Sequence, residues 1–277
     1  MRCGADCRPA RAAAVSANVH KTGGVRFAAG NGMQGDPTYP HGTAAAAGRD
    51  HNDVLAALLR RRPRLAHSVE PIDGRAGQEL HAAGTRPTHF YFPVDGLVAT
   101  RVMLERNRFG TAMPVGVEGM VGLPPWFGLD EWPCDVTQVT AGRVLRVPYA
   151  RLCSMLSDDR DARRLLQRYA AYGLQHAWQD HACALHHAID RRASRWLLTL
   201  SDRQRTPVLA LTHQHLASML GVRRQTVSDV ASSLRDSGLL EYRRGRWWLD
   251  RARLATGSCP CHRMLLRHYR EMVGHLL

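Results

Sequence analysis

The sequence of 277 residues contains almost no lysine, because Lys21 stands alone beside 37 arginines. Acidic residues are also few: 24 Asp and Glu oppose 38 Lys and Arg, which gives a formal net charge of +14. Such an excess of positive charge favours a polyanionic partner, either nucleic acid or an acidic membrane surface. A basic but inert surface is the alternative.

Long apolar runs are absent, so no segment is expected to cross a bilayer. No apolar stretch follows the N-terminal arginines as it would in a secretion signal, and we expect a cytoplasmic protein with no membrane partner. The seven cysteines are odd in number and scattered, which favours reduced thiols over a disulfide framework. We expect no metal and no cofactor, because the Cys-x-Cys pair of Cys259 and Cys261 lacks the usual ligand spacing.

Signatures of common catalytic sites are missing as well. The sequence has no phosphate-cradling glycine loop and no nucleophile elbow. Between residues 65 and 148 the only histidines are His67, His81 and His89, and no two of them form a tight pair. A cupin-like β-barrel enzyme needs several converging ligands, so we expect no enzyme and keep this class as the weaker alternative.

Changes in composition and residue periodicity divide the chain into segments. Residues 1–50 are rich in Ala, Gly and Arg without a sustained period, which predicts a disordered tail. Residues 51–157 begin with a short helix and continue as β-rich runs separated by turns, with a hairpin signal at Asp95-Gly96. This pattern is typical of a small β-barrel or β-roll.

Residues 158–188 contain no proline and carry a broad apolar stripe, which predicts a long helix. A second copy of the chain is the economical partner for that stripe, through coiled-coil-like packing. The alternative is that the stripe covers the chain's own barrel. The residues expected at the dimer interface are Leu166, Tyr169, Gly173 and Ala177.

Residues 189–262 carry the pattern of a winged helix-turn-helix. Thr212 is suited to cap a short helix that Gly221 ends, and a second helix is predicted at about 223–235. Two short helices joined by a tight turn are typical of a DNA-binding helix-turn-helix. A two-stranded wing with a basic turn follows, and residues 188–277 hold 16 arginines against seven acidic residues.

The outer face of the second helix carries side chains that can bind base edges. Arginine pairs bidentately with guanine, and glutamine does the same with adenine. We expect the base contacts to come from Arg224, Gln225, Ser228 and Asp229. Contacts to the DNA backbone are expected from Thr212, Arg223, Thr226, Arg243, Arg244 and Arg246.

Over residues 53–261 the sequence resembles the Crp/Fnr family of transcription regulators. The motifs that carry the resemblance are THFYFP at 88–93, GVEGMVGL at 116–123, LGVRR at 220–224 and YRRGR at 242–246. It implies an α+β fold with an N-terminal cyclic-nucleotide-binding-like β-roll, a long dimerisation helix and a C-terminal winged helix-turn-helix, leaving 263–277 as an extension. It also implies a homodimer on a symmetric double-stranded operator, with RNA polymerase as a candidate partner.

The resemblance also bears on the effector. Cyclic-nucleotide sensors of the family hold the ribose with a glutamate and the phosphate with an Arg-Ser pair. Here Leu123 falls at the first position, and Trp132 and Pro133 fall at the pair. We therefore expect an effector other than cyclic AMP, its identity unknown, and a solvated turn carboxylate at the neighbouring Glu118.

Two residues of the second helix depart from the family pattern. Arg223 stands where a capping serine is common, and Asp229 stands where some relatives have a base-reading arginine. An effector-free architectural DNA-binding protein is the alternative to a sequence-specific regulator. Preference for one operator sequence separates the two.

Overall fold

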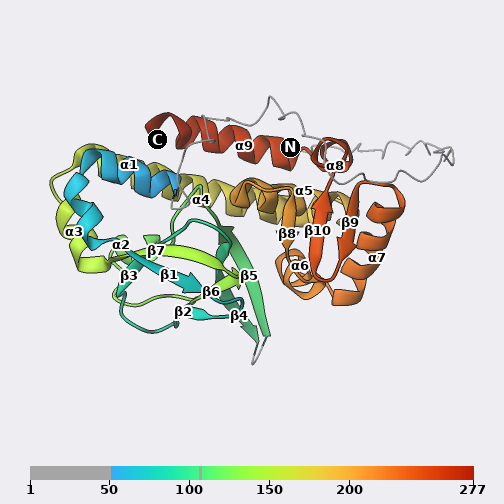
Figure 1. Ribbon diagram of the computed structural model, residues 1–277, viewed down its shortest axis with the longest axis horizontal. Coiled ribbons are helices and arrows are strands. Elements are labelled where there is room, and N and C mark those ends of the chain that lie inside the picture. Colours follow the sequence, from blue (N-terminus) through green and yellow to red (C-terminus); the bar gives the residue numbers. More distant parts are fainter. Residues whose placement is uncertain (1–50, 106–107) are drawn as a thin grey trace, which may run out of the picture. The chain divides into compact units, whose positions relative to one another are not determined.

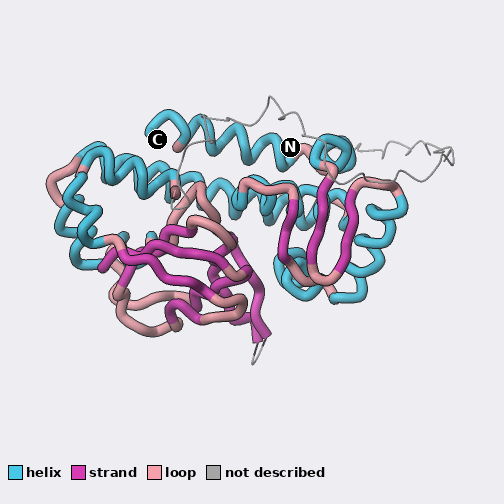
Figure 2. The backbone as a smooth tube through the Cα atoms, viewed as in Figure 1, coloured by secondary structure: helices cyan, strands magenta, loops and turns pink. Residues whose placement is uncertain are grey.

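The computed structural model describes residues 51–105 and 108–277, so the predicted tail at 1–50 lies outside it (Figure 1). Within this part of the chain the fold is α+β, as expected from the sequence. Figure 2 shows the strands in two groups, one in an N-terminal β-roll and one in a small C-terminal sheet. In the part described, no helix is both long enough and apolar enough to span a membrane.

The β-roll consists of two antiparallel sheets. One has the strand order β1-β7-β3 and the other has the order β2-β6-β4-β5. The strands are β1 (Glu70–Gly74), β2 (Glu79–His81), β3 (His89–Pro93), β4 (Leu97–Glu105), β5 (Arg108–Val115), β6 (Asp135–Thr140) and β7 (Gly142–Pro148). The hairpin predicted at Asp95-Gly96 was wrong, because β3 pairs with β7 while β4 pairs with β5 and β6 in the other sheet. The turn leads the chain from one sheet to the other, and Gly96 has a φ of 77° that suits glycine.

Residues from both sheets fill the interior of the roll. Tyr91, Val98, Val136 and Val144 meet there with the indole of Trp132, which is only 1% exposed. The Trp132 ring lies 5.0 Å from the ring of His81. A large aromatic side chain therefore packs inside the roll. It stands at one of the two positions where cyclic-nucleotide sensors of the family carry their Arg-Ser pair.

Helices cover one side of the roll. They are α1 (Asp53–Arg61), the 3-10 turn η1 (Pro63–Ser68), α2 (Leu123–Trp126), α3 (Tyr149–Leu156), α4 (Arg160–His186), α9 (Cys261–Met272) and the 3-10 turn η2 (Gly274–Leu276). The long helix α4 begins where the Asp159 side chain accepts a hydrogen bond from the Ala162 amide at 2.9 Å. That bond lowers the pKa of Asp159.

The C-terminal helix α9 packs along α4 and completes the core of the roll side (Figure 1). Val273 is fully buried in the same cluster as Leu165 and Tyr169, and the Tyr269 hydroxyl donates to the Glu118 carbonyl at 2.7 Å. The boundary predicted between 262 and 263 therefore falls inside a helix. This prediction was wrong because helix packing between distant segments leaves no local signal at that position.

The remaining elements form the C-terminal domain. They are α5 (Ile189–Gln204), β8 (Val208–Ala210), α6 (His213–Leu220), α7 (Arg224–Asp236), β9 (Leu240–Arg243), β10 (Arg246–Leu249) and α8 (Arg251–Gly257). The strand order is β8-β10-β9, and all pairs are antiparallel. Core residues Leu197, Leu216, Val227 and Trp247 bring the helices and the sheet together.

A buried ion pair joins the roll to α5. Glu118, in the turn after β5, lies 3.2 Å from the guanidinium of Arg203, and Arg203 also donates to the Pro114 carbonyl. Burial raises the pKa of Glu118, and the positive charge of Arg203 opposes that rise. The expectation of a solvated carboxylate at Glu118 was wrong, because Arg203 of α5 and Tyr269 of α9 pack against the turn and leave the Glu118 side chain only 15% exposed.

Breaking this ion pair should destabilise the chain. Glu118→Ala leaves the Arg203 guanidinium, which is 3% exposed, without its carboxylate partner, and removal of one member of a buried pair costs about 3–5 kcal/mol. The measurement is the free energy of unfolding in denaturant. Glu131→Ala, which removes an exposed carboxylate from the same domain, is the control, and a Glu118→Ala effect no larger than the control would contradict the role given to the pair.

Candidate DNA-binding site

Local sequence signals build the turn between α6 and α7. The Thr212 side chain accepts a hydrogen bond from the His215 amide at 3.1 Å and so caps α6. Gly221 ends α6 in the left-handed conformation, with a φ of 68° that a side chain would strain. Arg223 precedes α7 and gives it no side-chain cap. The tight turn places α7 across α6, as in a helix-turn-helix.

The outer face of α7 presents Arg224, Gln225 and Asp229, all of which are exposed. The Gln225 amide donates to the Asp229 carboxylate at 2.9 Å, one helical turn away. This pairing holds the glutamine side chain along the helix, while Arg224 is exposed at the first turn. The three side chains therefore form an exposed polar surface on the first turns of α7.

Ser228 differs from its neighbours on α7. Its hydroxyl lies 2.9 Å from Nδ1 of His213 on α6 and donates to the Arg224 carbonyl at 3.2 Å. The side chain is half-buried. The Ser228 hydroxyl is therefore engaged within the domain, where it links α7 to α6.

An aromatic cluster packs α6 and α7 against the wing strands. The His213 ring lies 4.3 Å from the Tyr242 ring and 5.2 Å from the Trp247 ring. Burial and the nearby charge of Arg224 lower the pKa of His213. Trp247 donates through Nε1 to the Leu211 carbonyl at 2.7 Å. Helix α6, helix α7 and the wing strands are thus fixed to one another around His213.

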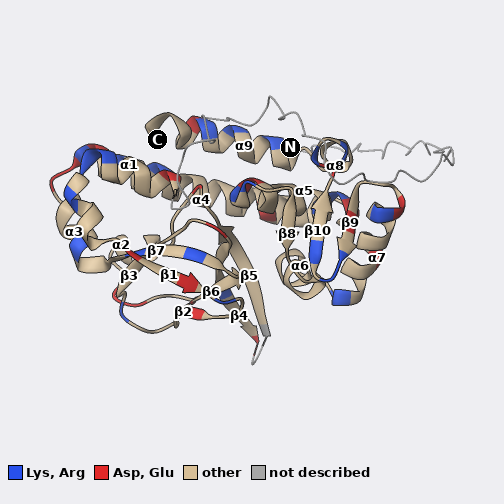
Figure 3. Cartoon of the chain, in the orientation of Figure 1, with Lys and Arg blue, Asp and Glu red and all other residues tan. Residues whose placement is uncertain are grey.

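The wing is a two-residue hairpin between β9 and β10. Arg244 has a φ of 48° and Gly245 a φ of 75°, and two consecutive positive φ values match the turn that best fits the twist of a hairpin. Arg243, Arg244 and Arg246 are exposed and line a shallow hollow of about 620 Å³ with Trp248. The arginines of this turn and of the start of α7 lie along the same lower edge in Figure 3.

Of the residues predicted to contact the DNA backbone, Thr212 and Arg223 are exposed at the two helix starts, and Thr226 is half-buried on α7. The Thr212 oxygen already accepts from its own helix, so its hydroxyl hydrogen remains the group available to a phosphate. These residues flank the outer face of α7 on the side of the helix starts, where anions are favoured.

The residues predicted at the dimer interface are mostly buried inside the single chain. Leu166 and Tyr169 belong to the core shared with α1 and α9, and a side chain at Gly173 would meet the Met113 methyl at 3.2 Å. Only Ala177 is exposed. The assignment of Leu166, Tyr169 and Gly173 was wrong because α4 is apolar on more than one face, and the roll covers the face that they occupy.

A different face of α4 stays apolar and exposed. Leu174 is 52% exposed, Trp178 is 61% exposed and Leu185 is 66% exposed. Their spacing of four and seven residues places them on one stripe of the helix. The tip of the β4–β5 hairpin is a second exposed apolar segment, with Met103 and Leu104.

We expected no metal ligands, yet the structure brings four together at the far end of α4. One ligand atom from each of Cys183, His187, Cys259 and Cys261 lies within 4.8 Å of all the others. Sequence spacing missed this group because the Cys-x-Cys pair has its partners on α4, about 70 residues upstream. The i, i+4 spacing of Cys183 and His187 was the available signal.

Comparisons with known proteins agree with this geometry. Residues 191–256 match the Crp-like helix-turn-helix domain family. No curated protein sequence matches the chain. Among solved structures, FixK2 from Bradyrhizobium japonicum is 20% identical with a TM-score of 0.61, and the match covers 69% of this chain and 98% of that one.

Two further solved structures have the same fold. The regulator CLP from Xanthomonas campestris, described as c-di-GMP responsive, is 18% identical with a TM-score of 0.55, over 71% of this chain and 97% of that one. A CooA variant from Carboxydothermus hydrogenoformans is 14% identical with a TM-score of 0.55, over 76% and 97%. Residues 191–256 are thus a Crp-like helix-turn-helix domain, and the chain as a whole has the fold of these regulators.

Proposed function

We propose that the chain acts as a homodimer that binds one operator sequence through α7 and the wing. The observation that carries this proposal is the outer face of α7, where Arg224 and the Gln225–Asp229 pair are exposed beside a basic wing. Arginine and glutamine are the side chains that distinguish guanine and adenine in the major groove. The regulators of this family are transcription factors, which argues against the enzyme alternative.

In this proposal the contacts divide by what they bind. Arg224 and Gln225 contact base edges, and Asp229 orients Gln225 and can accept from a cytosine amino group. Ser228 acts mainly through His213, as the hydrogen bond between them supports. Thr212, Arg223 and Thr226 contact phosphates beside the helix starts, and Arg243, Arg244 and Arg246 contact the backbone through the wing.

The dimer interface of this proposal is the exposed stripe of Leu174, Trp178 and Leu185 on α4. Three large apolar side chains on one helical stripe are unusual on a surface that faces only water. A second copy of α4 would bury them by the same stripe, in a two-fold symmetric contact. Two copies of α7 then meet an operator whose half-sites lie about one helical turn apart.

The effector of this regulator is not a cyclic nucleotide in our proposal. Trp132 fills the interior of the roll, and Leu123 is an apolar, half-buried side chain. Leu123 has no group that can hydrogen-bond a ribose hydroxyl, and Trp132 has no positive charge to offer a cyclic phosphate. We therefore expect DNA binding to be unchanged by added cyclic AMP.

Operator selection from random duplex DNA tests the proposed function. The purified full-length chain, with and without cyclic AMP, should enrich the same two-fold symmetric motif with half-sites about one helical turn apart. Retention of DNA without any enriched motif would instead identify an architectural DNA-binding protein. A motif that needs cyclic AMP would contradict the proposal for the roll.

Arg224→Ala should relax the preference at one operator position and weaken specific binding by about 1–3 kcal/mol. Arg244→Ala should weaken specific and random DNA alike and reduce the salt dependence of binding, because it removes a phosphate contact. Arg235→Ala, which removes an exposed arginine near the end of α7, is the control. Dissociation constants on the selected operator and on a scrambled duplex are the measurement. Equal loss on both duplexes for Arg224→Ala would place that residue on the backbone.

Trp178→Ala should weaken dimerisation by about 2 kcal/mol or more, because a central tryptophan commonly dominates an interface. Sedimentation equilibrium of the full-length chain measures the change. Phe127→Ala removes another exposed aromatic ring, at the end of α2, and should leave the dimer intact. A Trp178→Ala chain that dimerises as strongly as the Phe127→Ala chain would exclude this stripe as the interface.

A further inference from the structure

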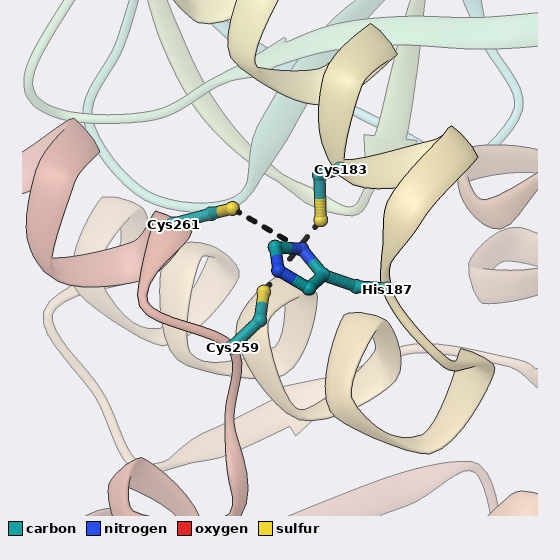
Figure 4. A group of neighbouring side chains, drawn as sticks. All are labelled: Cys183, His187, Cys259 and Cys261. Carbon is teal, nitrogen blue, oxygen red and sulfur yellow. Dashed lines mark hydrogen bonds between the residues drawn. The ribbon is translucent and has the colours of Figure 1, made fainter. Parts of the chain in front are cut away.

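The side chains of Cys183, His187, Cys259 and Cys261 point toward one another at the junction of α4 with the α8–α9 segment (Figure 4). Cys183 lies in the last turn of α4, and His187 ends that helix four residues later. Cys259 lies between α8 and α9, and Cys261 is the first residue of α9. None of the four takes part in the proposed DNA contacts or in the exposed α4 stripe.

From this geometry we propose that the chain binds one zinc ion through three thiolates and one imidazole. Three cysteines and one histidine are a usual ligand set for structural zinc, which is four-coordinate and tetrahedral. The site goes beyond the proposed function, because it needs neither DNA nor a dimer.

The distances fit one tetrahedral ion. With Zn–S bonds of about 2.3 Å and Zn–N bonds of about 2.0–2.1 Å, a regular tetrahedron has S···S edges of about 3.8 Å and S···N edges of about 3.6 Å. The Cys183 and Cys259 sulfurs are 3.6 Å apart, and the Cys261 sulfur lies 3.5 Å from Nδ1 of His187. All four ligand atoms lie within 4.8 Å of one another. An iron–sulfur cluster would spread its cysteines over several irons and needs a wider group.

The surroundings also suit a structural metal. The three cysteines are each 1% exposed and form a cluster of their own, so water is kept from the ion. The Gln179 amide donates to the Cys261 sulfur at 3.1 Å, as partners around a metal ligand commonly do.

The position of the site gives the ion a mechanical role. The Cys259 amide also donates to the Arg191 carbonyl at the start of α5. A zinc ion would therefore link the end of α4 to the loop before α9. This link lies beside the short junction between His186 and Ile189, where α4 ends and α5 begins. That junction connects the roll and its long helix to the DNA-binding domain, so the bound ion would fix the direction in which α5 leaves α4.

Metal content and cobalt spectroscopy of the full-length chain test the proposal. Protein purified with reductant and without chelator should contain about one zinc per chain, and Co²⁺ in its place should give the visible bands of a tetrahedral thiolate site. Cys261→Ser and His187→Ala should lose most of the zinc. His186→Ala and Cys153→Ser, which alter an exposed histidine of the same turn and a cysteine outside the group, should retain it.

Two further readouts keep the result independent of folding failures in the variants. A Cys3→Ser/Cys7→Ser chain should bind zinc as the unmodified chain does, which excludes the two thiols of residues 1–50 as ligands. Chelation should lower the melting temperature of the unmodified chain but not that of His187→Ala. The proposal is overturned if the unmodified chain contains no stoichiometric zinc and Co²⁺ gives only an octahedral spectrum. A Cys183–Cys259 disulfide in protein kept under reductant would also overturn it.

Discussion

The buried pair of Glu118 and Arg203 is the contact on which the arrangement of the described chain depends. Its two charges come from the turn after β5 and from the last turn of α5, so neither domain alone satisfies both. The backbone fits as closely as the charges do: the Val117 amide donates to the Arg203 carbonyl at 3.0 Å, and a Cβ at Gly116 would lie 2.1 Å from that carbonyl oxygen. A pair that is costly to leave unmatched favours a single way of docking the roll on α5.

The position of the DNA-binding surface depends on how the roll packs against α5. Leu97, Ala99 and Val139 of the roll share one core with α5, α6 and α7. The Thr111 hydroxyl of β5 also lies 2.8 Å from the Ser218 hydroxyl of α6. The outer face of α7 is therefore supported through α6 by a strand of the roll. A change of shape in β5 would reach the recognition helix through packed atoms, without a flexible linker between them.

Local chemistry made the DNA-binding domain readable from the sequence, and distant packing hid much of the rest. Gly221, the α7 stripe that includes Val227, and the arginines of the wing act within a few residues of one another, so their pattern predicts their structure. The burial of Leu166 was not predictable, because it depends on a core built from α1, the roll and Val273, which lie far from it in the sequence. The group around Cys183 was missed for the same reason, since its ligands come from both sides of the DNA-binding domain in the sequence.

The packing of α9 on α4 has a consequence for biosynthesis. The core that contains Leu165 and Tyr169 is closed by Tyr269 and Val273, so the roll domain is assembled from two separate stretches, with the helix-turn-helix inserted between them. A ribosome releases the N-terminal stretch first, and domains generally begin to fold as they emerge. The apolar face of α4 that α9 covers therefore stays exposed while the DNA-binding domain is translated. During that interval the nascent chain presents a surface suited to chaperones, which the finished protein hides.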